Sequence, residues 1–164
     1  MTTPTIRPQL PADQAALRQA FIELQEVERA LHDSRRPGPE IATAYIAWME
    51  QQVAENRGEV FVAEADGAFL GFVACWVERN SDIIETPDSN VFGYISDICV
   101  MPQWRGRGIA AALLSAAEAH LAGSGVARIR LGALAGNRAA LSAYRKQGFA
   151  PYEIVLEKRV APPG

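Results

Sequence analysis

The sequence has few of the features that mark metal-binding, secreted or membrane proteins. Among its 164 residues only two are cysteines, Cys75 and Cys99, and each lies within an apolar run. They form no CxxC pair and no Cys/His spacing suited to zinc, so we expect two buried thiols and no metal site. The N-terminus lacks the basic-then-apolar order of a signal peptide, and no apolar stretch approaches the roughly 18 residues of a membrane span. These absences predict a cytoplasmic protein with no membrane partner.

An excess of positive charge is also lacking. Sixteen Lys and Arg residues against nineteen Asp and Glu residues give a formal net charge of −3. No overall basic field is available to hold a nucleic-acid backbone, and we expect no nucleic-acid partner. Internal repeats and low-complexity linkers are missing as well, and the length is close to that of one typical domain. We therefore expect residues 1–164 to form a single domain.

The spacing of apolar residues predicts an α/β fold with a mixed sheet. Helical spacing occurs from Leu17 to Leu31 and from Ile41 to Val53, whereas the stretches around the Asp66-Gly67 turn alternate as strands do. The expected elements are a strand at 5–8, helices at 17–31 and 41–53, strands at 59–65, 68–78 and 92–100, a helix at 109–122, a strand at 127–134, a helix at 137–147 and a last strand near 152–158. The predicted order is therefore β-α-α-β-β-β-α-β-α-β.

The densest functional signal is the stretch VMPQWRGRGIAAALL, residues 100–114, in which a strand ends at a proline and two glycines open a helix. Such a turn directs unpaired backbone N–H groups to one point, and the helix dipole adds positive potential there. It can hold a phosphate or pyrophosphate without a lysine. The predicted anion site consists of Arg105, Gly106, Arg107, Gly108, Ile109, Ala110 and Ala111.

The same string also fits the dinucleotide fingerprint GxGxxA, which makes a nicotinamide-dependent oxidoreductase an alternative. In that class an acid about 20 residues downstream binds the ribose hydroxyl. No Asp or Glu occurs between Glu118 and Glu153, so the sequence disfavours this alternative. A Walker A loop, GxxxxGK followed by Ser or Thr, does not occur.

Two blocks of residues resemble the GNAT superfamily of acetyl-CoA-dependent N-acetyltransferases. The pyrophosphate signature of that family is Arg or Gln, two residues, Gly, one residue, and Gly or Ala. One register places it on Arg105, Gly108 and Ala110, and a second places it on Gln103, Gly106 and Gly108. Downstream, NRAALSAYRKQGF matches the family at Asn137, Ala140, Tyr144, Gly148 and Phe149. The resemblance is strong over residues 92–149.

The resemblance implies a GNAT-like fold whose central strands splay apart to admit acetyl-CoA as cosubstrate. It also implies direct transfer of the acetyl group to a primary amine of a small molecule or a peptide, with pairing into a homodimer. The backbone of Ile98, Cys99 and Val100 is implied to contact the cofactor. Asn137 is implied to lie near the pantetheine arm, and its side chain is also suited to cap a helix.

Tyr144 is the candidate general acid. It lies seven residues after Asn137, close to two helical turns, so both side chains project from one helix face. Its pKa near 10 keeps it protonated at neutral pH, and it can therefore donate a proton to a departing thiolate. The resemblance implies the same role. A noncatalytic acyl-CoA-binding regulatory module remains an alternative, although Tyr144 argues against it.

The general base is left open by the sequence. Many relatives use a Glu on the strand at 92–100, where this chain has Tyr94, Ser96 and Asp97. We take Asp97 as the first candidate, with Tyr94, Ser96 and Glu26 as alternatives. Strict strand alternation predicts two faces, one with Tyr94, Ser96 and Ile98 and the other with Ile95, Asp97 and Cys99.

Overall fold

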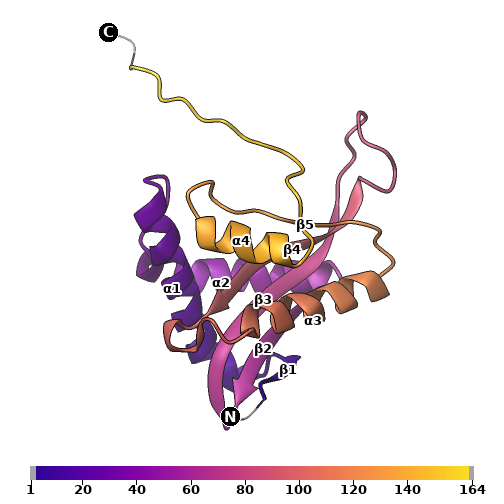
Figure 1. Ribbon diagram of the computed structural model, residues 1–164. Coiled ribbons are helices and arrows are strands. Elements are labelled where there is room, and N and C mark those ends of the chain that lie inside the picture. Colours follow the sequence, from indigo (N-terminus) through magenta and orange to yellow (C-terminus); the bar gives the residue numbers. More distant parts are fainter. Residues whose placement is uncertain (1–2, 163–164) are drawn as a thin grey trace.

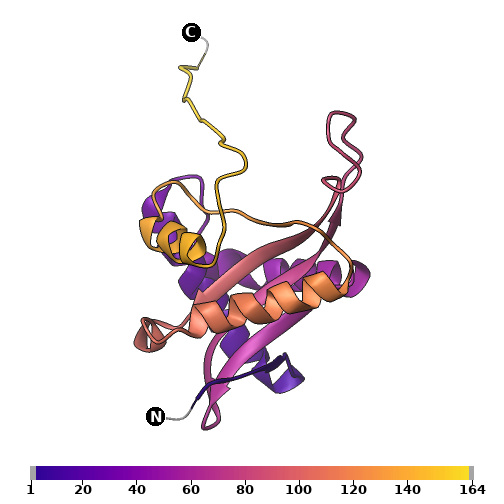
Figure 2. The same ribbon diagram turned by 45° about the vertical axis from the view of Figure 1, so that its right-hand side comes forward.

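The computed structural model describes residues 3–162 and contains one five-stranded sheet with helices on both faces (Figures 1 and 2). The strands lie in the order β1 (Thr5–Pro8), β2 (Glu59–Ala65), β3 (Ala68–Arg79), β4 (Val91–Val100) and β5 (Ile129–Leu131). β1 to β4 are antiparallel neighbours, and β5 pairs with β4 in parallel. The helices are α1 (Gln14–Leu31), α2 (Gly38–Glu55), α3 (Ile109–Gly123) and α4 (Arg138–Lys146), with 3-10 turns η1 (Pro11–Asp13) and η2 (Pro102–Trp104).

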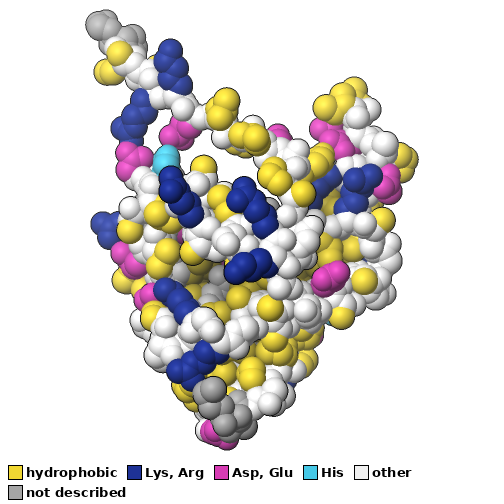
Figure 3. All heavy atoms as spheres, in the orientation of Figure 1, with side chains coloured by type: hydrophobic (Ala, Val, Ile, Leu, Met, Phe, Trp, Pro, Cys, Tyr) yellow, Lys and Arg dark blue, Asp and Glu magenta, His cyan; other side chains and the backbone are white. Residues whose placement is uncertain are grey.

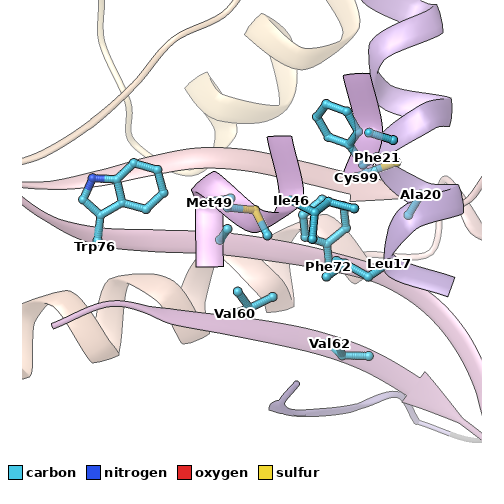
Figure 4. Packing of buried hydrophobic residues seen from close by; sticks show 12 residues of the cluster. Leu17, Ala20, Phe21, Ile46, Met49, Val60, Val62, Phe72, Trp76 and Cys99 are labelled. Carbon is cyan, nitrogen blue, oxygen red and sulfur yellow. The ribbon is translucent and has the colours of Figure 1, made fainter. Parts of the chain in front are cut away.

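The sheet is covered on both faces, and β3 can occupy its centre because its residues 70–77 are all buried. α1 and α2 cover one face, and α3 covers the other. Figure 4 shows the helix side chains Ile46 and Met49 near Phe72 of the sheet, and Phe21 beside Cys99; all belong to one buried cluster. The buried residues of this first cluster are Leu17, Ala20, Phe21, Ala42, Ile46, Met49, Val60, Val62, Phe72, Ala74, Trp76 and Cys99. Within residues 3–162, no helix combines the length and apolar character needed to cross a membrane.

β4 and β5 separate after a short pairing. Their parallel register runs only from Gly93 with Ile129 to Ile95 with Leu131, whereas β4 continues to Val100. Beyond Ile95, the β5 side of β4 has no strand partner among the described residues. The predicted splay of the central strands is confirmed, and α4 lies over this opening (Figure 1).

Ser96 is a β-bulge in β4. It lies between two register pairs, Ala74 with Asp97 and Cys75 with Ile95, and has no partner of its own on β3. The extra residue changes which side chains share a face. Tyr94, Asp97 and Cys99 face α1 and α2, whereas Ile95, Ile98 and Val100 face α3. The predicted faces were wrong because they assumed a strict period of two.

The expected last strand at Tyr152–Lys158 is not formed. Residues 150–162 are extended and lead away from the body of the molecule (Figures 1 and 2). A strand needs a neighbour for its backbone N–H and C=O groups, and no described strand of the chain pairs with this segment. The expected strand at 127–134 is also shortened, to Ile129–Leu131. The remaining predicted helices and strands are confirmed in order.

Candidate active site

The turn between β4 and α3 has the geometry of an anion site. Gly106 and Gly108 have φ angles of 74° and 77°, a left-handed conformation that favours glycine. A Cβ atom built on either residue meets nothing within 4 Å, so the turn is open to a ligand. α3 begins at Ile109, and the Ala112 N–H donates to the Gly108 carbonyl at 3.1 Å. The N–H groups of the first three helical residues therefore have no partner within the helix.

This turn lines a cleft of about 590 Å³, the first cleft, bounded by α3, α4 and the end of β4. Its charged lining residues are Arg105 and Lys146, and none of its described lining residues is acidic. Free helix amides and two cations are suited to bind phosphate groups. The apolar rest of the lining suits the uncharged part of a ligand. Eight predicted cofactor residues line the first cleft: Ile98, Val100, Arg105, Gly106, Gly108, Ile109, Ala110 and Ala111.

Three predicted cofactor residues lie elsewhere. The Arg107 guanidinium stacks over the Trp104 ring at 4.8 Å. Cys99 is buried in the cluster beneath α1 and α2, because the bulge at Ser96 turns its side chain to that face. Asn137 caps α4, with its Oδ1 accepting from the Ala140 N–H at 3.1 Å.

Several lining residues of the first cleft were missed by the sequence interpretation, among them Trp104 and Lys146. Trp104 lies within η2, directly before the glycine turn. Lys146 follows Ala139 by seven residues and Ala143 by three on α4, and all three line the cleft. That helical spacing was the signal that could have identified Lys146.

The end of β4 offers backbone groups to the first cleft. The Met101 N–H donates to the Leu70 carbonyl on the β3 side at 2.9 Å. Because successive residues of a strand turn their backbone groups to opposite neighbours, Ile98 and Val100 direct theirs toward the opening. Arg105 Nε donates to the Val100 carbonyl at 3.0 Å, which fixes the turn against the strand.

Tyr144 separates the first cleft from a second, smaller one. The second cleft has a volume of about 70 Å³ and lies between α1, β4, the chain after β5, and α4. Tyr144, Ile98 and Ala140 line both clefts. Burial, followed by the negative charges of Glu28 and Asp97, raises the pKa of Tyr144 to about 12. The hydroxyl is therefore protonated at neutral pH and can donate a proton.

The second cleft has the opposite charge to the first. Glu28 and Asp97 line it, and its described lining contains no Lys or Arg. Asn137 lines it together with Tyr144, so the predicted shared helix face is confirmed. Arg35, which is not among the lining residues, pairs through its Nε with Glu28 at 2.7 Å. The cleft is therefore suited to a cationic group.

Asp97 is buried in a hydrogen-bonded setting. Its carboxylate accepts from the Tyr45 hydroxyl of α2 at 2.9 Å and from the Ser96 hydroxyl at 2.6 Å. Burial raises the pKa of Asp97 to about 6, against the lowering effect of the two hydrogen bonds. A carboxylate with this pKa is still ionised at neutral pH and is a stronger base than an exposed aspartate.

The first helix supplies Glu28 to this cleft, and the alternative base Glu26 lies elsewhere. The Glu26 Oε1 atom accepts from the Gly38 N–H at 2.6 Å, and its other oxygen pairs with Arg29 at 3.1 Å. These contacts hold the start of α2. The sequence interpretation did not choose Glu28 as a candidate base, although it follows Leu24 by one helical turn and both line the second cleft.

Together the two clefts can support acyl transfer to an amine. The first cleft is suited to a ligand that carries phosphates, and the second is suited to an amine. Tyr144 lies between them as a proton donor, with Asp97 as a proton acceptor on the amine side. Over residues 3–162, no group of three or more His, Cys, Asp or Glu residues is placed to hold a metal ion.

Comparison with known proteins gives a family match. The family model described as the acetyltransferase (GNAT) family matches residues 21–149. The chain is 31% identical over 160 residues to aminoglycoside N(6')-acetyltransferase type 1 of Stenotrophomonas maltophilia, covering 97% of this chain and 94% of that protein. It is 27% identical over 134 residues to an N-alpha-acetyltransferase of Sulfurisphaera tokodaii, covering 80% and 79% of the two chains.

Solved structures share the fold. The aminoglycoside N-acetyltransferase AAC(6')-Iy, solved in complex with CoA, superposes with a TM-score of 0.72 at 20% identity and covers 98% of this chain and 96% of that one. A predicted acetyltransferase from Clostridium acetobutylicum, solved with acetyl-CoA, gives a TM-score of 0.71 at 20% identity, with 96% of each chain covered.

Proposed function

The chain belongs to the acetyltransferase (GNAT) family, and from this premise we propose that it transfers the acetyl group of acetyl-CoA directly to a primary amine of a small molecule. We further propose that residues 1–164 act as one catalytic domain and that the reaction takes place in the cytoplasm. A cationic acceptor of the aminoglycoside class is the first candidate. It is supported by the 31% identity to an aminoglycoside acetyltransferase and by the acidic second cleft. A peptide N-terminus is the second candidate, supported by the relative from Sulfurisphaera tokodaii.

One observation carries the proposal: Tyr144 lines both the cationic first cleft and the acidic second cleft. Acetyl-CoA has its anionic phosphates at one end and its thioester at the other. With the phosphates at Gly106 and Gly108, its extended arm follows the open side of β4. The thioester then lies beside Tyr144, where the acceptor amine approaches from Glu28 and Asp97.

The glycine turn binds the pyrophosphate through the free N–H groups at the start of α3, with Lys146 adding positive charge. The backbone of Ile98 and Val100 pairs with the amides of the pantetheine arm, as a strand edge pairs with a peptide. A backbone N–H group of the same segment is directed at the thioester oxygen, where negative charge develops.

The acceptor amine must lose a proton before it attacks, because an alkylammonium group has a pKa of about 10.4. Asp97 accepts this proton. Because the pKa of Asp97 is raised, the difference between its pKa and that of the amine is smaller than for an exposed aspartate. The new C–N bond forms as the C–S bond breaks. Tyr144 protonates the departing thiolate and is reprotonated from solvent. Asp97 releases its proton to solvent, and so does the nitrogen of the new amide. The residues therefore end the cycle unchanged, with one proton released for each acetyl group transferred.

The test is a screen for thiol release from acetyl-CoA against a panel of amines. We expect release with aminoglycosides and other cationic small amines, and little with neutral amines of the same size. Release only with peptides would reassign the acceptor to a protein N-terminus or lysine. Binding of acetyl-CoA without release on any amine would contradict the proposal and support a noncatalytic acyl-CoA-binding module.

A further inference from the structure

Glu78, near the end of β3, is a carboxylate without a cationic partner. Its Oε2 atom accepts from the Trp76 Nε1–H at 2.8 Å, and its side chain is half-buried. Among the described residues it forms no ion pair, whereas Glu28 pairs with Arg35. The contact with Trp76 holds the carboxylate in position, and its charge remains available to a cation from outside the protein.

Glu78 lies on the face of the sheet that carries the second cleft. Trp76 is opposite Tyr94 in the register of β3 and β4, and both pack in the cluster beneath α1 and α2. Glu78 follows Trp76 by two residues and therefore shares this face. Burial, followed by the negative charges of Asp97, Glu78 and Glu28, raises the pKa of Tyr94. The three carboxylates therefore act on one hydroxyl and belong to one acidic surface.

Aromatic rings lie between Asp97 and Glu78. The pair of Trp76 with Tyr94 comes between them in the register of β3 and β4, with ring centroids 5.4 Å apart. Trp48 of α2 is 44% exposed and packs edge-on against Trp76 at 5.7 Å. Aromatic rings offer apolar contact area, and their faces attract cations. This surface is therefore suited to the body of an organic cation.

The spacing of the carboxylates sets the size of a ligand that reaches both. Asp97 lies opposite Ala74, and Glu78 follows Ala74 by four residues on β3. At about 3.3 Å per residue, the two carboxylates are about 13 Å apart along the strand. A ligand that bridges them needs one ammonium group at each end of such a span.

The neighbouring cations of the protein are engaged elsewhere. Arg130 stacks over the ring of Phe92, which lies opposite Glu78 on β4. Its guanidinium donates to the Ser89 hydroxyl and lies 3.9 Å from the carboxylate of Glu85. Figure 3 shows further Lys and Arg side chains over α4, the helix that lines the first cleft. A polycationic ligand is therefore attracted toward Glu78 and repelled from α4.

We propose that Glu78, together with the exposed ring of Trp48, forms a second cation subsite for the acceptor, about 13 Å along the sheet from Asp97. This assignment rests on the proposed function and narrows its acceptors to polycationic amines that place one ammonium group at Asp97 and another at Glu78. Large aminoglycosides have this length, and their shorter fragments do not. The subsite contributes to acceptor binding and takes no part in the chemical step.

The test compares neomycin with neamine, a fragment of neomycin that keeps only its central ring and one amino sugar. Glu78→Gln should raise the KM for neomycin roughly tenfold at nearly constant kcat, because one charge-assisted contact is lost. The KM for neamine should stay nearly unchanged. Glu78→Asp retains the charge and should recover most of the affinity for neomycin. Glu118→Gln is the matched control, because it removes an equal charge from α3 on the opposite face of the sheet and should change neither KM.

Equal shifts of the two KM values in Glu78→Gln, or no shift in either, would overturn the subsite. Failure of the proposed function is a different result, namely no thiol release by the unmodified protein with either amine. Calorimetry of neomycin on the CoA-loaded protein then decides. Binding that is roughly tenfold weaker in Glu78→Gln supports the subsite. Equal or undetectable binding in the two proteins overturns it.

Discussion

The hydroxyl of Tyr45 donates to the carboxylate of Asp97, lying 3.1 and 2.9 Å from its two oxygens. This contact ties the second helix to the bulged strand at the point where the acidic cleft begins. Tyr45 also stacks on Phe21 with ring centroids 4.4 Å apart, so its hydroxyl is held in place by the core. The helices therefore set the basicity of a carboxylate that lies on the sheet.

Tyr45→Phe should shift the pH dependence of the reaction. The Tyr45 hydrogen bond lowers the pKa of Asp97, so its loss raises that pKa above about 6. Since the base must be deprotonated, the acidic limb of kcat/KM should move to higher pH by roughly one unit. Tyr94→Phe, which removes a nearby hydroxyl that makes no hydrogen bond to Asp97, should not move the limb. An unshifted profile in Tyr45→Phe would exclude Asp97 as the titrating base.

Two carboxylate variants should separate binding from proton transfer. Asp97→Asn should lower kcat/KM by roughly 100-fold and remove the acidic limb, because the proton acceptor is lost. Glu28→Gln should mainly raise the KM for a cationic amine while the limb stays near pH 6. The check is a full pH profile of both variants with one acceptor. If the acidic limb of kcat/KM is intact in Asp97→Asn and lost in Glu28→Gln, the general base is Glu28 and not Asp97.

Strand β4 and the turn after it show which features of the site could be predicted from the sequence and which could not. The glycine turn and the Asn137–Tyr144 pair depend on short, local spacings, and both could be predicted. The bulge at Ser96 could not, because it depends on the register with β3, and one extra residue exchanges the faces of everything beyond it. Asp97 was placed on the correct strand but with the wrong neighbours, and Tyr45 was not found.

The C-terminal segment shows a second limit. The apolar run from Ile154 to Leu156 favours a strand, yet a strand forms only where an edge is available for pairing. Glu157 and Arg159 pair with His32 and Asp33 in the connection after α1, and no described strand pairs with the segment. The pattern of apolar residues indicates that a segment favours a strand conformation. It does not identify the strand with which the segment would pair.

Gly108→Asp should weaken the binding of CoA. Gly108 is the N-cap of α3, directly before Ile109, and a carboxylate there repels phosphates at the free helix amides. Gly125→Asp is a matched control, because Gly125 has a φ of 81° against 77° and is equally open, yet it lies beyond the other end of α3. We expect calorimetric affinity to fall by roughly tenfold or more for Gly108→Asp alone, a free energy of about 1.4 kcal/mol. Equal affinities of the two variants would place the pyrophosphate elsewhere.

Cys75 and Cys99 should be inert in the folded protein. Both thiols are free and buried, and burial raises the pKa of each to about 11. A disulfide reagent should therefore label the native chain slowly and the urea-unfolded chain rapidly at two sites. Fast labelling of the native chain would show that one of the thiols is open to solvent. The slow background also allows thiol release from acetyl-CoA to be followed directly.

Tyr144→Phe should lower kcat by roughly 100-fold or more while the affinity for CoA stays nearly unchanged. The hydroxyl is protonated up to a pKa of about 12, and a thiolate that leaves without this proton is a poorer leaving group. The phenyl ring keeps its contact with Phe149, whose centroid lies 6.2 Å away, so the wall between the two clefts survives. Turnover is measured by thiol release at saturating acceptor, and CoA affinity by calorimetry on the same sample. If CoA affinity falls in parallel with turnover, Tyr144 contributes to CoA binding and not to proton transfer. If kcat is unchanged, Tyr144 is not the general acid.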